Sequence, residues 1–504
     1  MNVEKRVSLS HLRRSRSLSI WSWSKAMSFC VQSRCWLPLP ALLSAWGCVE
    51  HSGPVLSDAP GIPTPDPIAP IPTPDQLAWQ TQELSAFLHF GVNTFVDQEL
   101  GDGKASPTLF NPTGLDANQW LATLQNAGFR QAMLTAKHHD GFCLWPSRCT
   151  DYSVAASPWR NGAGDVVREF VDAAHRANIR VGLALSPLDR HDPAYGTPAY
   201  LTVFECQLTE LLSNYGALDE VWIWGGPSLP TGFDWDTVRS LVRRLQPHAL
   251  IDIGNFMSPA DGDVRSVGQA LADPVIITDQ TSVVTIPDST SQTPVWYPAE
   301  AAYAIRPGWF WHAAEDTQLQ PLSQLLDFYY DSVGRNSRLL LDVPPNDQGL
   351  LADPDVAEVN EFGAAIRAIY RSNLAAGRPA SADSSFKGSA ERAASQAVDG
   401  KLDTFWAAGE DQTKARLEVD FGSDTTFNVV SLQEPIALGE RTTQYHLEAK
   451  SNGTWTTIAS GTVIGERKLQ RVGEITASSL ALVITESRAV PAIAELGVYE
   501  SPFP

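Results

Sequence analysis

The sequence predicts two folded parts in one chain, a (β/α)8-like TIM barrel followed by an antiparallel β-sandwich. Its 504 residues, 43% hydrophobic and 19% charged, form a globular composition with enough chain for two or three domains. Short apolar runs alternate with helix-period segments from Leu77 to about Tyr370, which is typical of repeated βα units. After Arg371 the runs are shorter, richer in Thr, Val and Ile, and often alternate, which is typical of an antiparallel sheet.

Residues 1–47 are predicted to be a leader. The 12-residue apolar run 36–47 is too short to cross a bilayer but fits the core of a signal peptide. It ends at Cys48, and Ala45-Trp46-Gly47 before it is similar to the processing box of bacterial lipoproteins, although Ala45 and Trp46 depart from the usual residues. We therefore expect an exported protein, periplasmic or at the cell surface, that meets a membrane only through a lipid anchor on Cys48. Plain secretion and an unprocessed tail are the alternatives.

Residues 48–76 are predicted to be an extended linker. Proline recurs every two or three residues from Pro60 to Pro74, and large apolar residues are sparse. This composition favours a polyproline II conformation. We expect a semi-rigid tether without folded structure.

Residues 77–371 are predicted to form the barrel. Asp165 suits the first turn of one of the expected helices. No Gly-rich dinucleotide loop occurs, which favours a barrel over an open doubly wound sheet. The expected parallel strands are 84–90, 132–136, 181–186, 221–224, 250–253 and 339–343, and the expected helices are 118–127, 164–177, 203–215 and 235–245.

Residues 376–504 are predicted to form the sandwich. The segment 416–421 alternates polar and apolar residues, and 480–484 is a short apolar run. Both patterns are those of short strands in a two-layer antiparallel fold.

The charge of the chain limits its partners. The formal net charge is −20, and seven basic residues but only one acid precede Cys48, so the remainder carries −26. Such a body repels phosphate backbones, which argues against nucleic-acid binding and leaves neutral ligands.

Three cysteines follow Cys48, namely Cys143, Cys149 and Cys206. An odd number without paired spacing predicts partly buried free thiols, with a Cys143–Cys149 bridge as the alternative. No Cys/His cluster has zinc spacing.

Polar residues follow two of the predicted barrel strands, at the positions where barrels carry their chemistry. His89 follows the apolar residues 84–88 of one predicted strand, and His138, His139 and Asp140 follow the next strand. These groups are suited to ligate a metal, to transfer protons, or to hydrogen-bond a polyhydroxyl ligand, and a purely structural role is the alternative. Adjacent side chains of an extended segment point to opposite sides, which disfavours a two-histidine chelate.

Six ordered blocks of the barrel resemble glycoside hydrolase family 29, the α-L-fucosidases, and in particular the branch specific for α-1,3/1,4-fucosyl linkages. Together the blocks cover nearly the whole barrel. They are AFLHFGVNTF (86–95), TAKHHDGFCLWPSRCTDYSV (135–154), SPWRNGAGDVVREFVDAA (157–174), NYGALDEVW (214–222), AIRPGWFWH (304–312) and SVGRNSRLLLDVPPNDQGLL (332–351).

The resemblance implies a sugar pocket. His89, His138 and His139 match histidines that bind the fucose hydroxyls, and Trp145 matches a tryptophan that lines the pocket. Imidazole both donates and accepts hydrogen bonds, and an indole face covers the apolar side of a 6-deoxy sugar, so the chemistry agrees. For three further tryptophans, Trp296, Trp309 and Trp311, rim and core positions remain equally open.

The catalytic positions of the family are changed. A retaining glycosidase needs a carboxylate nucleophile and a carboxylic acid roughly 5 Å apart. The nucleophile is the Asp of a Trp-Phe-Asp-Gly run, and Trp224 stands there in Trp222-Ile223-Trp224-Gly225. The acid is the Glu of a Val-Gly-Asn-Glu run, which best matches Ala270, and no Glu occurs between Glu220 and Glu300. Substitute carboxylates near these segments are Asp219, Glu220, Asp273, Asp279 and Glu300.

The sandwich resembles the discoidin-type (F5/8 type C), galactose-binding-like jelly-roll modules that follow the barrel in this branch. The blocks that carry the resemblance are AVDGKLDTFW (397–406), LEVDFG (417–422), LQEPIALGER (432–441) and GTVIGERKL (461–469). No cofactor is expected. The loop with Asp399 and Asp403 has the oxygen-rich texture of a structural Ca²⁺ site, which is the alternative. A glycan-binding role and a buttressing role remain equally open for this domain.

We therefore expect an exported fucosidase-family protein that recognises fucosylated oligosaccharides or glycoconjugates with weak or no retaining hydrolysis. The alternative is an active α-L-fucosidase that hydrolyses α-1,3/1,4-fucosyl linkages with a relocated carboxylate pair.

Overall fold

The computed structural model describes residues 61–503, except 225–232, 254–261, 271–277 and 286–292. The leader and Cys48 lie outside the described residues. Within these ranges, none of the helices combines the length and the apolar character that a membrane crossing requires.

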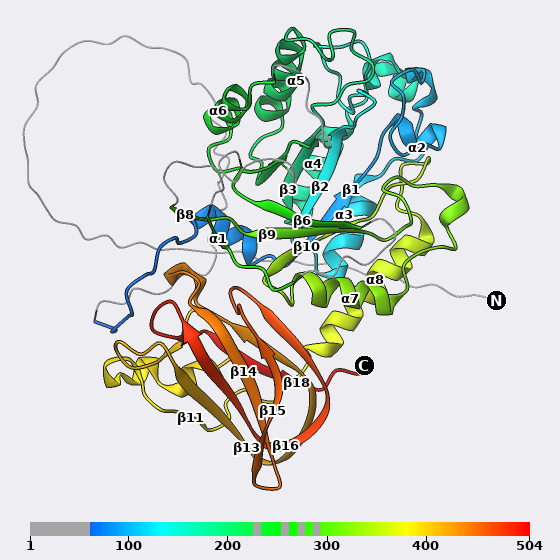
Figure 1. Cartoon of the computed structure of the whole chain (residues 1–504). Helices are drawn as coiled ribbons and strands as arrows, with labels where there is room; N and C mark the ends of the chain where they lie inside the picture. Colours follow the sequence, from blue (N-terminus) through cyan, green and yellow to red (C-terminus); the bar gives the residue numbers. More distant parts are fainter. Residues whose placement is uncertain (1–60, 225–232, 254–261, 271–277, 286–292, 504) are drawn as a thin grey trace, which may run out of the picture. The chain divides into compact units, whose positions relative to one another are not determined.

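Residues 74–369 fold into an eight-stranded parallel sheet that curls into a near-barrel with helices around it (Figure 1). The strand order is β5-β4-β3-β2-β1-β10-β9-β6. A parallel bridge between Asp252 at the end of β5 and Val264 just before β6 brings the two edges together. The strands are β1 (Leu84–Leu88), β2 (Gln131–Lys137), β3 (Arg180–Leu185), β4 (Glu220–Trp222), β5 (Leu250–Asp252), β6 (Arg265–Ala270), β9 (Ala299–Ala304) and β10 (Ser337–Asp342).

The six strands predicted from apolar runs are all present, and β6 and β9 were missed. β6 is polar and contains Gly268, so it lacks the apolar run that marks a buried strand. β9 is fully buried but rich in Ala, whose small side chain favours helices over strands. Pairing with β10 on one side and β6 on the other makes β9 a strand despite this composition.

The four predicted helices are also present, within a few residues of the expected bounds. Asp165 is the N-cap of α4, where its side chain accepts a hydrogen bond from the Arg168 backbone N–H. These helices are α3 (Ala117–Ala127), α4 (Val166–Ala177), α5 (Tyr200–Asn214) and α6 (Trp235–Leu245), and further helices are α1 (Pro74–Gln80), α2 (Val92–Val96), α7 (Leu322–Ser332) and α8 (Asp353–Ile369). Short 3-10 helices are η1 (Pro107–Leu109), η2 (Val154–Ala156), η3 (Trp159–Gly162), η4 (Ala313–Glu315), η5 (Phe386–Gly388), η6 (Ala390–Arg392), η7 (Ala394–Ala397) and η8 (Ile436–Leu438).

The C-terminal part of the chain, after α8, is antiparallel, as predicted. Its main sheet has the order β11-β13-β16-β14-β15, and β18 pairs with β13. Alternate residues of β13, such as Leu417, Val419 and Phe421, are buried in a core separate from that of the barrel. The strands are β11 (Ala380–Ala382), β12 (Trp406–Ala407), β13 (Ala415–Gln433), β14 (Thr442–Ser451), β15 (Thr454–Gly461), β16 (Lys468–Ser487), β17 (Ala492–Ile493) and β18 (Glu495–Tyr499). In the barrel part of the chain, β7 (Val283–Thr285) pairs antiparallel with β8 (Pro294–Trp296) in a separate two-stranded sheet.

The composition of the Pro-rich segment predicts a semi-rigid extended tether, but its described part is bound to the rest of the protein. Residues 63–69, here called the strap, are bound along the sandwich. Ile68 N donates to Leu438 O at 2.9 Å, and Arg441 Nη2 donates to Asp66 O at 2.7 Å. Arg392 and Arg488 donate to further strap oxygens. Proline removes backbone donors, so arginine side chains of the sandwich satisfy the carbonyl groups that an extended chain leaves unpaired.

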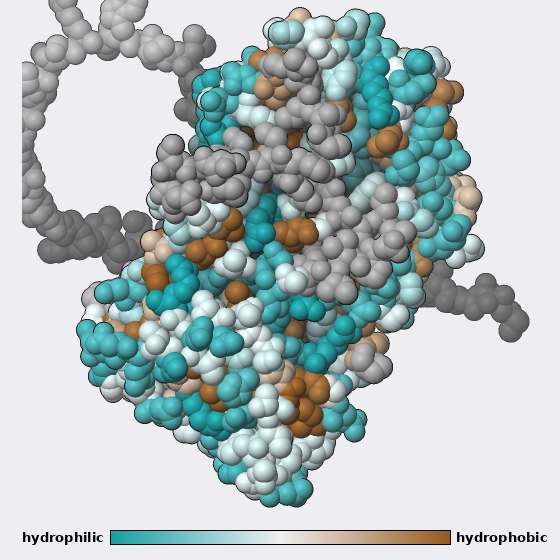
Figure 2. Space-filling view, in the orientation of Figure 1, coloured by the Kyte–Doolittle hydropathy of each residue, from teal (hydrophilic) through white to brown (hydrophobic). Residues whose placement is uncertain are grey.

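The sandwich also contacts the start of β10. Asn336 N donates to Arg467 O at 2.9 Å, and Leu469 N donates to Gly334 O at 3.0 Å. Arg467 forms an ion pair of 2.8 Å with Glu83, just before β1. In Figure 2, hydrophilic residues and residues of intermediate hydropathy cover most of the coloured part of the visible face, and hydrophobic residues form small separate groups.

Candidate functional site

A cavity of about 390 Å³ lies at the carboxyl ends of the first barrel strands. Strand-end residues and two loop segments line it, which is the position where barrels of this kind carry their ligands. Its lining residues are Phe87, His89, Glu99, Leu100, Thr135, Lys137, His138, His139, Ala184, Leu185, Ser186, Trp222, Trp224 and Trp309.

The three predicted histidines meet in this pocket. The rings of His138 and His139 lie 4.0 Å apart, and those of His89 and His138 lie 5.8 Å apart. The expectation that adjacent histidines point to opposite sides was wrong, because β2 ends at Lys137 and the chain is no longer extended at the pair. Each ring is held by one neighbour: His89 by Asp342 at 2.7 Å, His138 by Asn93 at 3.3 Å, and His139 by Ser186 at 2.6 Å.

Burial keeps these imidazoles neutral. It lowers the pKa of His89 and of His139 to about 3, and it lowers the pKa of His138 well below its ordinary value. The nearby charge of Arg190 lowers the pKa of His139 further. A neutral imidazole has one donor and one acceptor nitrogen, so with one nitrogen held by a neighbour the other is available to a hydroxyl group.

The floor and one wall of the pocket are aromatic. The rings of Phe87 and Trp222 lie 4.6 Å apart, and the ring of Trp224 lies 5.1 Å from that of His139. Trp224 thus lines the pocket without closing it, since the cavity persists beside the indole. Ala270 is the last residue of β6.

Among the described residues that line the pocket, Glu99 carries the only carboxylate. It accepts hydrogen bonds from the backbone N–H groups of Trp309 at 2.9 Å and Phe310 at 3.0 Å, and His312 Nε2 lies 2.8 Å from it. No periodic pattern marks Glu99 in the sequence, because it lies in a loop and reaches the pocket through contacts with residues about 210 positions away.

The substitute carboxylates proposed from sequence lie elsewhere. Asp219 precedes β4 and pairs with Arg180, and Asp279 pairs with Lys468 of the sandwich. Asp273 lies outside the described residues. Glu220 and Glu300 are buried near the starts of their strands, at the opposite end from the pocket.

Glu220 and Glu300 share one guanidinium. Arg338 Nη2 lies 2.9 Å from Glu220 Oε2 and 2.5 Å from Glu300 Oε2. Burial raises the pKa of Glu300, and the nearby Glu220 and Asp252 add to this against the opposing charge of Arg338. The group is a buried charge network that joins β4, β9 and β10 inside the barrel.

The tryptophans divide between pocket and core. Trp309 lines the pocket beside His89. Trp145 does not line it: this side chain is buried and its Nε1 donates to Glu210 at 2.8 Å. Trp296 is buried and donates to Gln80, and Trp311 donates to Asp316.

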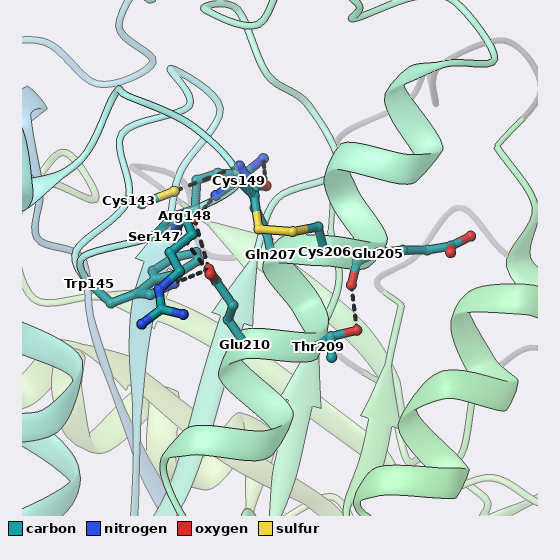
Figure 3. The surroundings of a disulfide bond; sticks show 11 residues. Cys143, Trp145, Ser147, Arg148, Cys149, Glu205, Cys206, Gln207, Thr209 and Glu210 are labelled. Carbon is teal, nitrogen blue, oxygen red and sulfur yellow. Dashed lines mark hydrogen bonds between the residues drawn. A yellow bond between two sulfur atoms is a disulfide. The ribbon is translucent and has the colours of Figure 1, made fainter.

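A disulfide holds the loop that follows the histidine pair. Cys149 is bonded to Cys206 of α5, and Cys143 is a buried free thiol (Figure 3). The alternative Cys143–Cys149 bridge and the prediction of free thiols at 149 and 206 were therefore wrong. One helical turn beyond Cys206, Glu210 accepts hydrogen bonds from Trp145, Ser147 and the Arg148 backbone (Figure 3).

In the oxygen-rich loop 399–404 of the sandwich, the Asp399 carboxylate accepts hydrogen bonds from residues of the same loop. Asp399 Oδ1 accepts from Lys401 N at 2.9 Å, and Oδ2 accepts from Thr404 Oγ1 at 2.8 Å. Within the described ranges, the carboxylates close enough together to share an ion are Glu220, Asp252 and Glu300, a group without Asp399 or Asp403. The expectation of no cofactor, with Ca²⁺ in this loop as the alternative, stays a prediction.

Family models match both folded parts of the chain. The model described as Alpha-L-fucosidase matches residues 77–368, and the model described as F5/8 type C domain matches residues 379–496. The chain belongs to the α-L-fucosidase family. Alpha-L-fucosidase 1 of Arabidopsis thaliana is 42% identical over 464 residues, which are 88% of this chain and 90% of the relative. A rice relative (Oryza sativa subsp. japonica), named as a putative alpha-L-fucosidase 1, is 40% identical over 478 residues, or 92% and 90% of the two chains.

Solved α-L-fucosidase structures share the fold. A putative α-L-fucosidase from Bacteroides thetaiotaomicron superposes with a TM-score of 0.81 and 36% identity, covering 88% of this chain and 100% of that one. A Ruminococcus gnavus GH29 fucosidase, solved in complex with fucose, gives a TM-score of 0.79 and 32% identity over 87% and 96% of the chains. The predicted resemblance and the predicted fold class are therefore confirmed.

Proposed function

We propose that this α-L-fucosidase-family protein binds terminal fucose of oligosaccharides or glycoconjugates in its barrel pocket and hydrolyses them weakly or not at all by the retaining mechanism. The neutral histidine trio supports sugar binding, because it offers hydrogen bonds to hydroxyl groups beside aromatic faces. The Ruminococcus gnavus relative, whose structure contains fucose, supports the choice of sugar.

The observation that carries the proposal is Trp224 in the pocket wall, at the position expected for the nucleophile. An indole cannot form the glycosyl ester that retention requires. Glu99 is already hydrogen-bonded to two backbone N–H groups and lies beside His312, which makes it a poor replacement.

Turnover of aryl and natural α-1,3/1,4-fucosides tests the proposal, with Trp224→Asp and Trp224→Asp/Ala270→Glu measured beside the natural protein. We expect fucose binding without turnover in the natural protein. In the double variant we expect turnover to rise by about a hundredfold or more above background, because a nucleophile and an acid supply several kcal/mol of barrier lowering. Robust turnover by the natural protein would contradict the proposal.

The second candidate is an active α-L-fucosidase with a relocated carboxylate pair. The relatives named as fucosidases favour it, since they match this chain over nearly its whole length. It requires a carboxylate from outside the described pocket lining, such as Asp273, so loss of turnover in Asp273→Asn would support it.

We also propose that the protein is exported and anchored through Cys48. The Cys149–Cys206 bridge supports export, because disulfides persist in oxidising compartments. Radiolabelled fatty acid is expected to label the natural protein and not Cys48→Ala. Equal labelling of both, or of neither, would exclude this anchor.

A further inference from the structure

We propose that two rim segments, 97–101 and 308–312, form a clasp at the mouth of the barrel pocket, and that protonated His312 closes it. The inference rests on the proposed sugar-binding function of the pocket. One segment follows α2 and the other follows β9. Both contribute lining residues, Glu99 and Leu100 from the first and Trp309 from the second.

His312 lies between two carboxylates of the first segment. Its Nδ1 is 2.5 Å from Asp97 Oδ1, and its Nε2 is 2.8 Å from Glu99 Oε1. A neutral imidazole carries one N–H and satisfies only one of these oxygens, whereas an imidazolium donates to both. The geometry therefore favours the charged form, whose hydrogen bonds to carboxylates are the stronger kind.

Glu99 connects His312 to the pocket wall through hydrogen bonds. It accepts from the backbone N–H groups of Trp309 and Phe310, so its position fixes the backbone that carries the Trp309 ring. The Glu99 side chain lies directly against the backbone of Gly308, since a Cβ on Gly308 would be only 2.4 Å from Glu99 Oε1. Trp309 packs beside His89 with ring centroids 5.6 Å apart, so a displaced clasp would move a wall of the sugar pocket.

The other charged groups near His312 are on its own side of the clasp. Glu315 of η4 adds a negative charge. Arg306 Nη1 donates to the His312 carbonyl at 3.3 Å, and its own charge is balanced by Asp316 and Asp355.

Burial lowers the pKa of His312, but the hydrogen bonds to Asp97 and Glu99 and the charge of Glu315 outweigh it, so the pKa is raised. Because the pKa of His312 is raised in the folded protein, its imidazole is fully protonated below the ordinary histidine pKa. It loses this proton, and the clasp loses its positive charge, as the pH rises through the raised pKa. The three lining histidines have lowered pKa values and stay neutral over that range.

The test measures the affinity for methyl α-L-fucoside by calorimetry from pH 6 to pH 9. We expect the natural protein to bind about five- to tenfold more weakly at pH 9, because a charge-assisted hydrogen bond of His312 is then replaced by a neutral one that is roughly half as strong. His312→Gln keeps an amide donor but cannot titrate, so its affinity should be weak at both pH values and independent of pH. The matched control is His248→Gln, which replaces an exposed histidine paired with Asp75 and should keep the natural pH profile.

Hydrogen exchange of segment 97–103 in the ligand-free protein separates this inference from the proposed function. We expect protection of the natural protein to fall between pH 6 and pH 9, after correction for intrinsic exchange, to the level of His312→Gln. If protection falls but no fucoside binds at any pH, the clasp stands and the proposed function fails. If the fucoside binds with constant affinity and protection does not change, the clasp is overturned and the proposed function stands. If the variant does not fold, the pH dependence of the natural protein decides.

Discussion

At the level of single residues, the sequence identifies the groups that follow predicted strands. His89, His138 and His139 were identified in this way. Barrels carry their ligands at the carboxyl ends of the strands, so a polar residue just after a buried strand is a candidate site residue even before the structure is known. Glu99 and His312 were missed as site residues, since both lie in loops whose contact joins parts of the chain 213 positions apart. Trp145, which the resemblance places in the pocket, is not among the residues that line the cavity, and Glu210 accepts the hydrogen bond of its indole N–H.

His139 provides a residue-level prediction. Its Nδ1 is held by Ser186, which leaves Nε2 for a ligand hydroxyl. His139→Ala is expected to weaken fucoside binding about tenfold, the value of one hydrogen bond of about 1.4 kcal/mol. His175→Ala, on the exposed face of α4, is the control and should bind normally. Unchanged calorimetric affinity in His139→Ala would remove this residue from the site.

At the level of elements, the helical repeat places two residues of α5 on the same face, but the distant loop that they contact cannot be recognised from the sequence. Cys206 and Glu210 are four residues apart on α5 and therefore lie on one face, where they hold the 145–149 loop together. The cysteines that pair are 57 positions apart, so counting cysteines alone did not identify them. β9 was missed for a similar reason, because its strand conformation depends on pairing with β10 and β6 and not on its own composition.

The disulfide provides an element-level prediction. Cys149→Ser/Cys206→Ser is expected to lower the free energy of unfolding by about 4 kcal/mol in the chain-entropy account for a loop of this length. Chemical denaturation measures the change. A reducing agent should destabilise the natural protein and leave the double variant unaffected, and an equal response of the two proteins would argue against the bridge.

At the level of the whole molecule, composition predicted the order of the two folded parts but not how the chain joins them. The Pro-rich segment has the composition of a free linker, yet residues 63–69 are bound by arginines more than 300 positions later in the chain. Arg441 is buried, and its guanidinium donates to backbone oxygens, including that of Asp66. Such long-range pairing has no local signature in the sequence.

Gly439 provides a test of the strap. It has a φ of +87°, and a Cβ there would lie 2.1 Å from Ile68 O. Gly439→Ala is therefore expected to release the strap and to speed hydrogen exchange at Ile68 by about tenfold or more. Gly422→Ala is the matched control, because its φ is +77° but nothing lies within 4 Å of a Cβ. Equal exchange in the two variants would mean that strain alone, and not the lost contact, explains the effect.

The bound strap also has a mechanical consequence. Tension applied to the chain before residue 61 would load the strap's hydrogen bonds to Arg392, Arg441 and Arg488 before it reached α1 and β1. The C-terminal sandwich would bear that force first, although it is the more distant part in sequence. As long as these hydrogen bonds hold, tension from the N-terminal side would not reach the barrel, and the wall of its pocket would keep its geometry.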